Sequence, residues 1–419
     1  MNVADSELVM TILENNGHEC VSDISEAQII LFNTCSVRQH AEERVLGRIN
    51  NDMKYKLSGE VKIGVIGCMA QRLGKELLYL STGVDFVVGV DQYHKLPEII
   101  SSVFNQELIS FTDIDQQQVY PEIIPHHQDP LKAFITIMRG CNNFCSYCIV
   151  PYTRGRERSR SYQEIIADVT IAAEQGRQEV MLLGQNVNSY QYQDINFPRL
   201  LEMINNINGI RRIRFTTSHP KDLSDQLIRA MADSDKVCEH FHLAMQSGDD
   251  QILKRMNRGY TALHYYNLIC KLRKAMPHIA ITTDIIAGFP GETEDQFRRT
   301  YDLMKDIEFD YAYMFKFSPR SGTKAAEFND QIAEDIRLDR LQRLISQQEK
   351  ITYQKYRNQI GKTCEIYVES ISRRSEKEVA GKTRDFKVTV FPGNQDLIGK
   401  FVQVRIIDAV GWTLKGQRI

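Results

Sequence analysis

The sequence predicts an α/β protein in three parts: an N-terminal parallel α/β domain, a partial (βα)6 barrel, and a small antiparallel β-barrel at the C-terminus. Two observations lead to this prediction. Short apolar runs alternate with amphipathic helical stretches through most of the chain, which is the pattern of parallel sheets. Beyond about residue 360 the helical stretches stop, and short alternating strands follow one another between Gly and Asp turns.

The N-terminal third contains two strands of the buried type, and each is followed closely by a cysteine. Residues 27–32 precede Asn33-Thr34-Cys35, and residues 61–66 precede Gly67-Cys68-Met69. Ligands of parallel sheets bind beyond the carboxyl ends of the strands, so the two cysteines are expected to converge there as ligands. The alternative is a pair of inert, buried thiols.

A stretch from about residue 110 to residue 129 has no hydrophobic period and is followed by several prolines, so it reads as a linker. His126 and His127 are expected to be solvated loop residues within it. The predicted domains are 1–117, 127–357 and 358–419.

From Lys132 onward, strands and helices alternate six times, which predicts an incomplete parallel barrel with its chemistry on the loops after the strands. The predicted strands are 133–138, 179–183, 210–216, 240–245, 280–286 and 311–317. Helices are predicted at 161–175, 262–276 and 293–307, among others. Polar or Gly-rich loops follow the strands at 184–186, 217–219, 246–248, 288–292 and 318–320. Together these loops predict a pocket at the barrel mouth.

Three cysteines lie in the loop after the first barrel strand, with the spacing C-x3-C-x2-C: Cys141, Cys145 and Cys148. Three thiols cannot pair completely as disulfides. They can hold three irons of a four-iron cluster and leave the fourth iron open to a small molecule. Structural zinc is the alternative, but it needs four closed ligands, and no fourth Cys or His lies close by in the sequence.

The bulk composition describes an ordinary globular protein, with 42% hydrophobic residues, 25% charged residues and a net charge of -2. Nine cysteines form no even disulfide framework, which fits a reducing compartment. The sequence shows no signal region and no apolar run near the roughly 20 residues of a membrane span. We therefore expect a cytoplasmic protein that does not meet a membrane and works as a monomer.

Two local basic segments predict RNA contacts within this neutral chain. Residues 361–419 carry eleven Lys and Arg against seven Asp and Glu, and Arg373 and Arg374 lie side by side there. Arg154, Arg156 and Arg158 follow the cysteine loop and suit phosphate contacts. The alternatives are a solvated face for the first segment and internal salt bridges for the second.

Several longer motifs, taken together, match the pattern of one protein family. They are the cysteine spacing with Tyr147 before its last Cys, Asn33-Thr34-Cys35-Ser36-Val37-Arg38, residues 151–160, Thr216-Thr217-Ser218-His219-Pro220, Met256-Asn257-Arg258-Gly259-Tyr260 and Ser372-Arg373-Arg374-Ser375. Together they resemble the radical S-adenosylmethionine (SAM) methylthiotransferases, and most closely their MiaB-type tRNA branch. The resemblance covers nearly the whole chain. It implies an N-terminal methylthiotransferase domain, a radical SAM barrel and an RNA-binding TRAM domain of the OB-like type.

The resemblance implies a transferase that adds a methylthio group to C2 of N6-isopentenyladenosine, next to the anticodon in tRNA. It implies two SAM molecules and two 4Fe–4S clusters, one held by the loop cysteines and an auxiliary one with Cys35 and Cys68 among its ligands. Partners would be tRNA and an electron donor such as flavodoxin or ferredoxin. The expected SAM contacts combine this resemblance with the loops of the barrel mouth: Tyr147, Gly184, Gln185, Asn186, Ser218, Gln246 and Ser247.

The chain departs from the family pattern at its start, where Met1-Asn2 aligns with the end of a Gly-Cys-Gln-Met-Asn motif whose Cys is the first auxiliary ligand. The expectation is a chain lacking its extreme N-terminus, which cleaves SAM but transfers sulfur weakly. Cys238, Cys270 and Cys364 match no ligand motif and are expected to be core thiols.

Three other functions stay open on the sequence. Sister branches of the family act on an aspartate of a ribosomal protein or on threonylcarbamoyladenosine in tRNA. A non-catalytic iron–sulfur protein that binds RNA is the alternative from another class.

Overall fold

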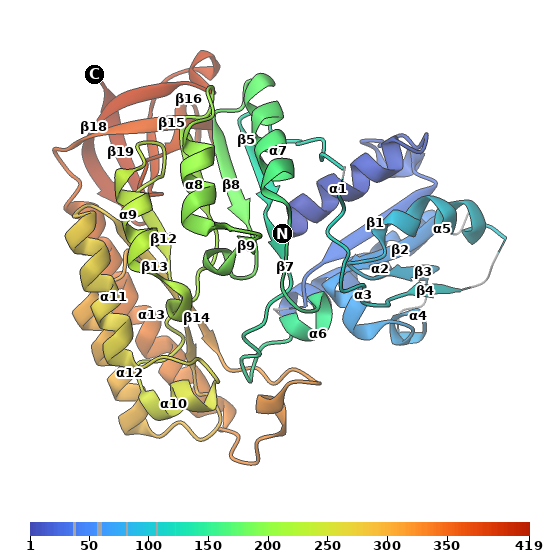
Figure 1. The fold of residues 1–419 in the computed structure, drawn as a ribbon, viewed down its shortest axis with the longest axis horizontal. Coiled ribbons are helices and arrows are strands. Elements are labelled where there is room, and N and C mark those ends of the chain that lie inside the picture. Colours follow the sequence, from blue (N-terminus) through green and yellow to red (C-terminus); the bar gives the residue numbers. More distant parts are fainter. Residues whose placement is uncertain (37–38, 57–60, 81–82, 106–107, 122) are drawn as a thin grey trace.

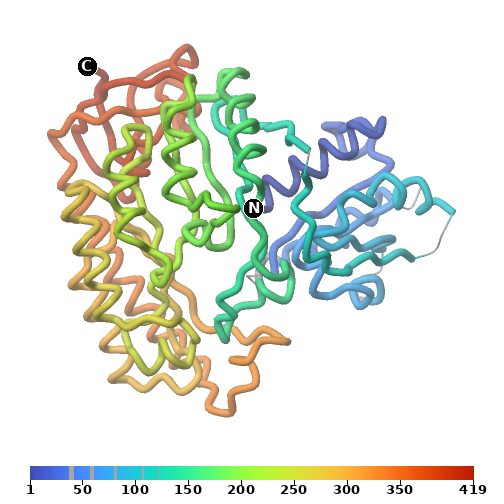
Figure 2. Tube along the Cα trace, viewed as in Figure 1, coloured from blue at the N-terminus to red at the C-terminus, as the bar shows by residue number. Residues whose placement is uncertain are grey.

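The protein consists of three parts that lie side by side (Figures 1 and 2). The computed structural model describes residues 1–36, 39–56, 61–80, 83–105, 108–121 and 123–419. The N-terminal residues lie between the first part and the barrel, whereas the C-terminus lies at the far side of the molecule (Figure 2). Among the helices of these described residues, none combines the length and the apolar character that crossing a membrane requires.

The N-terminal part is a parallel α/β domain, as predicted. Its four strands lie in the order β1 (Ile29–Thr34), β2 (Lys62–Gly67), β3 (Phe86–Val88) and β4 (Ile109–Phe111), all parallel. Separate apolar clusters form around the sheet, which explains why its central strands are buried on both faces. The helices are α1 (Asn2–Glu14), α2 (Gln39–Lys56), α3 (Cys68–Leu73), α4 (Glu76–Leu80) and α5 (Leu96–Val103).

The middle part is the predicted incomplete barrel of six parallel strands. They are β5 (Lys132–Thr136), β8 (Glu179–Leu183), β11 (Arg212–Phe215), β12 (His240–His242), β13 (Ala280–Ala287) and β14 (Tyr311–Lys316). The three-stranded sheets β11-β8-β5 and β12-β13-β14 meet through the isolated parallel bridges Ile213–Val237 and Ser218–Leu243. The fourth strand is shorter than predicted because beyond His242 only isolated bridges continue the pairing.

Helices cover the outside of the barrel and close one large apolar core against its strands. They are α7 (Tyr162–Glu174), α8 (Phe197–Asn205), α9 (Asp225–Asp233), α11 (Ala262–Ala275), α12 (Glu294–Ile307) and α13 (Glu334–Arg357). Short elements occupy the mouth: β6 (Met138–Arg139), α6 (Val150–Arg154), β7 (Arg158–Ser159), β9 (Gln191–Tyr192), β10 (Ile195–Asn196) and α10 (Asp250–Arg255).

The C-terminal part is a closed barrel of five strands in the order β15-β16-β17-β19-β18. Their bounds are β15 (Thr363–Ser372), β16 (Ser375–Lys382), β17 (Val388–Pro392), β18 (Phe401–Val410) and β19 (Thr413–Arg418). The predicted small barrel is confirmed, and its strand pairs are antiparallel except for β17 and β19, which pair in parallel. A ring with an odd number of strands cannot alternate direction throughout, so one pair must be parallel. The sequence predicts three of these strands, at 364–368, 387–391 and 401–407, and misses β16 and β19. The polar run of β16 hides its buried Val379 and Gly381.

The C-terminal barrel packs on the amino ends of the strands of the middle barrel. Tyr367 Oη donates to the Leu131 carbonyl just before β5 at 2.9 Å, and Gln178 Nε2, just before β8, donates to the Gly399 carbonyl at 3.1 Å. Arg212 at the start of β11 donates to the Lys382 carbonyl at 2.8 Å. Near β14, Lys387 Nζ lies 3.1 Å from Asp310 Oδ1, also at the strand's amino end. This part therefore lies at the end of the barrel opposite the cysteine loop.

His127 joins the N-terminal domain to the barrel, so its prediction as a solvated loop residue was wrong. It is 7% exposed, and its ring nitrogens lie 3.2 Å from Glu7 of α1 and 3.2 Å from Asp168 of α7. Arg160 also contacts Asp168, at 3.2 Å. The sequence placed His127 beside prolines in a linker, and only the docking of α1 against α7 buries it. His126 is exposed, as expected; its ring lies 2.8 Å from Glu14, and its amide donates to Thr11 Oγ1 at 2.8 Å.

Stability is expected to fall at alkaline pH because of His127. Burial lowers its pKa, but the hydrogen bonds with Asp168 and Glu7 outweigh burial and raise the pKa to about 9. The guanidiniums of Arg160 and Arg177 also lie close by, at Asp168 and at the His127 carbonyl. Because the pKa of His127 is higher in the folded state than in the unfolded state, protonation of the ring stabilises the fold. This stabilisation is complete below the unfolded pKa near 6.5 and is lost as the pH rises through about 9. Urea unfolding at pH 6, 7.5 and 9.5 is expected to show a loss of up to about 3 kcal/mol. The exposed neighbour provides the control: His126→Gln should keep this slope, and His127→Gln should flatten it. An unchanged slope in His127→Gln contradicts the assignment.

Candidate functional site

The cysteine loop (residues 141–148) lies at the carboxyl end of the first barrel strand, between β6 and α6. Its entry is fixed by Gly140, whose φ of 73° is a left-handed conformation that suits glycine. A Cβ at this position would lie 2.0 Å from the Arg156 carbonyl oxygen. The Cys141 amide donates to the Gly155 carbonyl at 3.2 Å, so both ends of the turn are tied together.

A strap formed by residues 256–258 holds the cysteine loop from the other side. The Ser146 amide donates to the Met256 carbonyl at 3.0 Å, and Asn257 Nδ2 donates to two loop carbonyls at 3.1 Å each. Arg258 is 5% exposed, and its Nη1 lies 3.4 Å from Cys145 Sγ and 3.5 Å from Tyr147 Oη. The motif at residues 256–260, which the sequence analysis used only for the family resemblance, therefore positions the cysteine loop.

Burial dominates the electrostatics of the loop thiols. It raises the pKa of Cys148 to about 12, with a further contribution from Cys145, and it raises the pKa of Cys141. Iron binding supplies positive charge that stabilises the thiolates, so loading the loop releases protons. In the described part of the chain, no group of three His, Cys, Asp or Glu side chains is arranged to bind a single metal ion.

The barrel mouth presents buried polar atoms that lack hydrogen-bond partners within the described residues. Gln185 Oε1 and Ser218 Oγ are two of them, and both belong to the predicted SAM contacts. Gly184 is buried beside them, and Gln246 is 7% exposed with a φ of 65°. Unpartnered buried polar atoms at a mouth fit a polar ligand such as SAM.

Two other predicted SAM contacts are already engaged within the protein. Asn186 donates to Asp222 at 2.7 Å and accepts from the His219 amide at 3.0 Å. Ser247 is fully buried, lies 3.2 Å from Thr300 Oγ1, and accepts from the Asp249 amide. These side chains position the loops of the mouth.

His219 is a residue that the sequence analysis did not select. Burial, together with the nearby cations of Arg258 and Lys221, lowers its pKa to about 2, so the ring is neutral. Nδ1 accepts from the Lys221 amide at 3.2 Å, which leaves the proton on Nε2. Nε2 is buried without a partner among the described residues. The signal that the sequence offered for His219 was its position at the end of the polar loop 217–219, which follows a predicted barrel strand.

The second pair of cysteines lies at the carboxyl ends of β1 and β2, where the sequence predicts it. Gly67, with a φ of 91°, turns the chain into α3, and a Cβ there would lie 2.5 Å from Asn33 Oδ1. Cys35 hydrogen-bonds with Cys68, and this bond lowers the pKa of Cys68 to about 6 against the effect of burial. The Arg154 guanidinium also lowers it, because Nε lies 3.1 Å from Cys68 Sγ. The two thiols therefore meet.

The helix α6 connects the two groups of cysteines. It begins at Val150, directly after the cysteine loop, and ends at Arg154, which contacts Cys68. Arg154 also pairs with the fully buried Asp5 of α1. One short helix thus places a three-thiol loop and a two-thiol pair next to each other.

The prediction that Arg154 and Arg158 contact RNA was wrong. Arg154 is 3% exposed and paired with Asp5, and Arg158 is 8% exposed and held by Asp91 at 3.0 Å. Both guanidiniums are used inside the protein, where the facing carboxylates come from the N-terminal domain. Arg156, Arg373 and Arg374 are exposed. Val37 and Arg38 of the first motif lie outside the described residues.

The remaining cysteines separate into different environments. Cys238 is buried and Cys364 is half-buried, but Cys270 is exposed on α11, so the core-thiol prediction was wrong for it.

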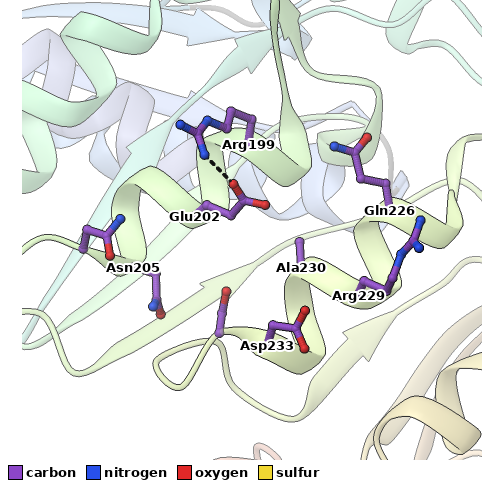
Figure 3. Close-up of a pocket in the computed structure, with 9 residues that line it drawn as sticks. Arg199, Glu202, Asn205, Gln226, Arg229, Ala230 and Asp233 are labelled. Carbon is purple, nitrogen blue, oxygen red and sulfur yellow. Dashed lines mark hydrogen bonds and ion pairs between the residues drawn. The ribbon is translucent and has the colours of Figure 1, made fainter.

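A polar groove between α8 and α9, drawn in Figure 3, contains the ion pair Arg199–Glu202. None of its lining residues belongs to the cysteine groups or the barrel mouth.

Three family profiles match the chain. They are the Radical SAM superfamily at residues 135–304, Uncharacterized protein family UPF0004 at residues 1–89, and the TRAM domain at residues 357–419. A tRNA-2-methylthio-N(6)-dimethylallyladenosine synthase of Thermoanaerobacter sp. (strain X514) is 46% identical over 100% of this chain and 90% of its own length. The chain belongs to this synthase family. Synthases of the same name are 44% identical in Azobacteroides pseudotrichonymphae genomovar. CFP2 (99% of this chain, 94% of the relative) and 41% identical in Phocaeicola vulgatus (100% and 94%).

The fold of the synthase family extends to more distant solved structures. The radical S-adenosylmethionine methyltransferase TsrM from Kitasatospora setae, solved with cobalamin and a 4Fe–4S cluster bound, matches with a TM-score of 0.60 at 13% identity. The match covers 77% of this chain and 74% of that one. At this identity the likeness concerns the fold alone, and it agrees with the predicted radical SAM barrel.

Proposed function

We propose that this chain adds a methylthio group to C2 of N6-isopentenyladenosine, next to the anticodon in tRNA, and uses two SAM molecules for it. The observation that carries the proposal is α6, which places the three-thiol loop beside the Cys35–Cys68 pair. Sulfur insertion into an inert C–H bond needs one centre that activates the bond and one that delivers sulfur. The names of the relatives favour this substrate over the ribosomal-protein aspartate and threonylcarbamoyladenosine.

In this proposal Cys141, Cys145 and Cys148 hold a SAM-binding 4Fe–4S cluster, and Cys35 and Cys68 are ligands of an auxiliary cluster. The first cluster with SAM would supply the radical that removes the C2 hydrogen. Tyr147, Gly184, Gln185, Ser218 and Gln246 would bind SAM. Asn186 and Ser247 would not contact SAM themselves but would hold the loops of the mouth in place.

The chain's own cations have definite tasks in this reaction. Arg258 orients Cys145 and Tyr147 and places a positive charge beside the cysteine loop. Arg154, at the end of α6 in the barrel mouth, stabilises the thiolate of Cys68 and pairs with Asp5, so it ties both residues of the N-terminal domain to the barrel. Neutral His219 would donate from Nε2 to an acceptor on a bound ligand.

The proposed partners are tRNA, contacted by Arg156, Arg373 and Arg374, and an electron donor such as flavodoxin or ferredoxin. The proposed domains are 1–117, 127–357 and 358–419, and the chain would act as a cytoplasmic monomer. Arg154 and Arg158 are buried, so the cations proposed to contact RNA are only the exposed ones.

The proposal is tested by anaerobic reconstitution with iron and sulfide, followed by reaction with SAM, a reductant and isopentenylated tRNA. Mass spectrometry of the digested nucleosides is expected to show the 2-methylthio product. Unmodified tRNA and tRNA carrying threonylcarbamoyladenosine serve as matched controls that remain unchanged. Formation of 5′-deoxyadenosine without a modified nucleoside would retain the radical half and refute sulfur transfer. Absence of both would favour the non-catalytic RNA-binding alternative.

A further inference from the structure

The two ends of the middle barrel carry different functions, which raises the question of how one RNA reaches both. The C-terminal barrel contacts residues at the amino ends of the strands, including Leu131, Arg212 and Asp310. The cysteine loop and the barrel mouth lie at the carboxyl ends. A strand of six residues rises about 20 Å, so these regions are separated by roughly that distance along the barrel. An RNA that contacts both must follow the wall of the barrel.

A series of contacting aromatic rings begins at the C-terminal barrel, enters the middle barrel at the amino end of β14 and crosses to β12. Trp412 lies in the turn between β18 and β19, and its ring centroid is 5.2 Å from that of Tyr311 at the start of β14. Tyr311 lies 4.9 Å from Tyr313, and Tyr313 lies 5.9 Å from His242 on β12. We call these four residues the aromatic ladder. It joins the C-terminal barrel to the middle barrel.

The ladder faces away from the helix layer. On β14, Ala312 is part of the apolar core that includes Leu344 of α13, and Met314 packs against that core. Alternation along a strand therefore directs Tyr311 and Tyr313 to the opposite face, toward the inside of the barrel. His242 Nε2 lies 3.3 Å from Asp284 Oδ2 of β13 on the same face. The ladder thus ends at a polar pair within the barrel.

The ladder is also accessible. Tyr313 and Trp412 are each 42% exposed, although large aromatic side chains of this kind normally find cover. β14 is the edge strand of its sheet in the described structure, so no further strand covers this side. The hairpin that carries Trp412 also carries two exposed cations, Arg405 and Arg418, at the end opposite its turn. Exposed aromatic rings are stacking platforms for the bases of single-stranded nucleic acids, and cations contact the backbone of the same strands.

We propose that the aromatic ladder stacks unpaired nucleotides of the substrate RNA and leads them from the C-terminal barrel into the middle barrel. This inference rests on the proposed function, because it takes tRNA as the substrate. Stacking is tolerant of sequence, since every base has a π-face. Unpaired loop nucleotides are the part of an RNA that can be splayed onto aromatic side chains. The His242–Asp284 pair would meet the polar edge of the base that enters.

The experiment uses the reconstituted full chain and takes advantage of Trp412, the single tryptophan of the sequence. Titration with an unmodified anticodon stem-loop RNA is expected to quench its fluorescence, whereas a blunt RNA duplex of equal length leaves it nearly unchanged. Trp412→Ala and Tyr313→Ala are expected to weaken stem-loop binding at least about fivefold, measured with a labelled RNA. Trp412→Phe retains a stacking ring and should stay within about twofold. Tyr266→Ala, which removes a tyrosine that is 39% exposed on α11, is the matched control without effect.

The outcomes separate this inference from the proposed reaction. Weaker binding in both Ala variants together with quenching in the native chain supports the ladder, whether or not methylthio product forms. Unchanged affinity in both Ala variants overturns the ladder, even if the native chain makes product. Equal quenching by duplex and stem-loop also overturns it, because stacking requires unpaired bases. Formation of 5′-deoxyadenosine without RNA verifies that each variant is correctly folded.

Discussion

Cys145→Ala is expected to abolish SAM cleavage and to lower the iron content of the reconstituted protein by about four atoms per chain. Cys145 is 8% exposed, and the Arg258 guanidinium lies 3.4 Å from its Sγ. Its loss removes one of three anchors and leaves Arg258 without its sulfur partner. Iron analysis and the yield of 5′-deoxyadenosine measure the effect, which we expect to exceed a hundredfold in yield because two thiols leave the cluster labile.

Cys270→Ala is the matched control for this experiment, because Cys270 is an exposed thiol on α11 with no partner among the cysteine groups. It is expected to retain full iron content and activity. The proposed cluster site is refuted if Cys145→Ala keeps both the iron and the 5′-deoxyadenosine. Zinc in place of iron in the native protein would revive the structural-metal alternative.

Asp5→Ala is expected to destabilise the protein by about 3–5 kcal/mol, the usual cost of leaving a buried charge unpaired. Asp5 is fully buried, and its carboxylate lies between the guanidiniums of Arg139 and Arg154. Burial by itself raises the pKa of Asp5, but Arg154 and Arg139 lower it below its ordinary value. Without the carboxylate, two cations face each other in the interior. Chemical denaturation followed by circular dichroism measures the loss.

The matched control for Asp5→Ala is Glu202→Ala, which removes the carboxylate of the exposed pair with Arg199. Exposed pairs contribute little, so its midpoint should barely move. Asp5→Ala is also expected to weaken retention of the auxiliary cluster, since Arg154 joins Asp5 to Cys68. Equal midpoints for the two variants would mean that water or local rearrangement compensates the two arginines.

The strand pattern and the cysteine spacing could be read from the sequence because both are local. Glu179–Leu183 and the helices near 162–174 and 294–307 follow from apolar periodicity within a few residues. Cys35 and Cys68 could be expected to meet because parallel strands bring their carboxyl ends to one edge, and the structure places the thiols in hydrogen-bond contact.

The roles of charged side chains could not be read in this way. Arg154, Arg156 and Arg158 look alike in the sequence, yet the first is buried against a carboxylate 149 positions away and the third against one 67 positions away. His127 looks like a linker residue, and Glu7 and Asp168 convert it into a buried contact between two domains. These assignments depend on which distant surfaces dock.

The sequence by itself therefore determined the three-part α/β organisation, the cysteine groups and the family resemblance, because each depends on short-range periodicity or spacing. Only the tertiary structure decided that α6 places the two cysteine groups side by side and that the C-terminal barrel packs at the far end of the middle barrel. The same holds for the aromatic ladder, whose rings come from two separate strands and a turn. The physical reason is that ion pairs and ring contacts form between surfaces remote in sequence, and their energies depend on the burial that packing creates.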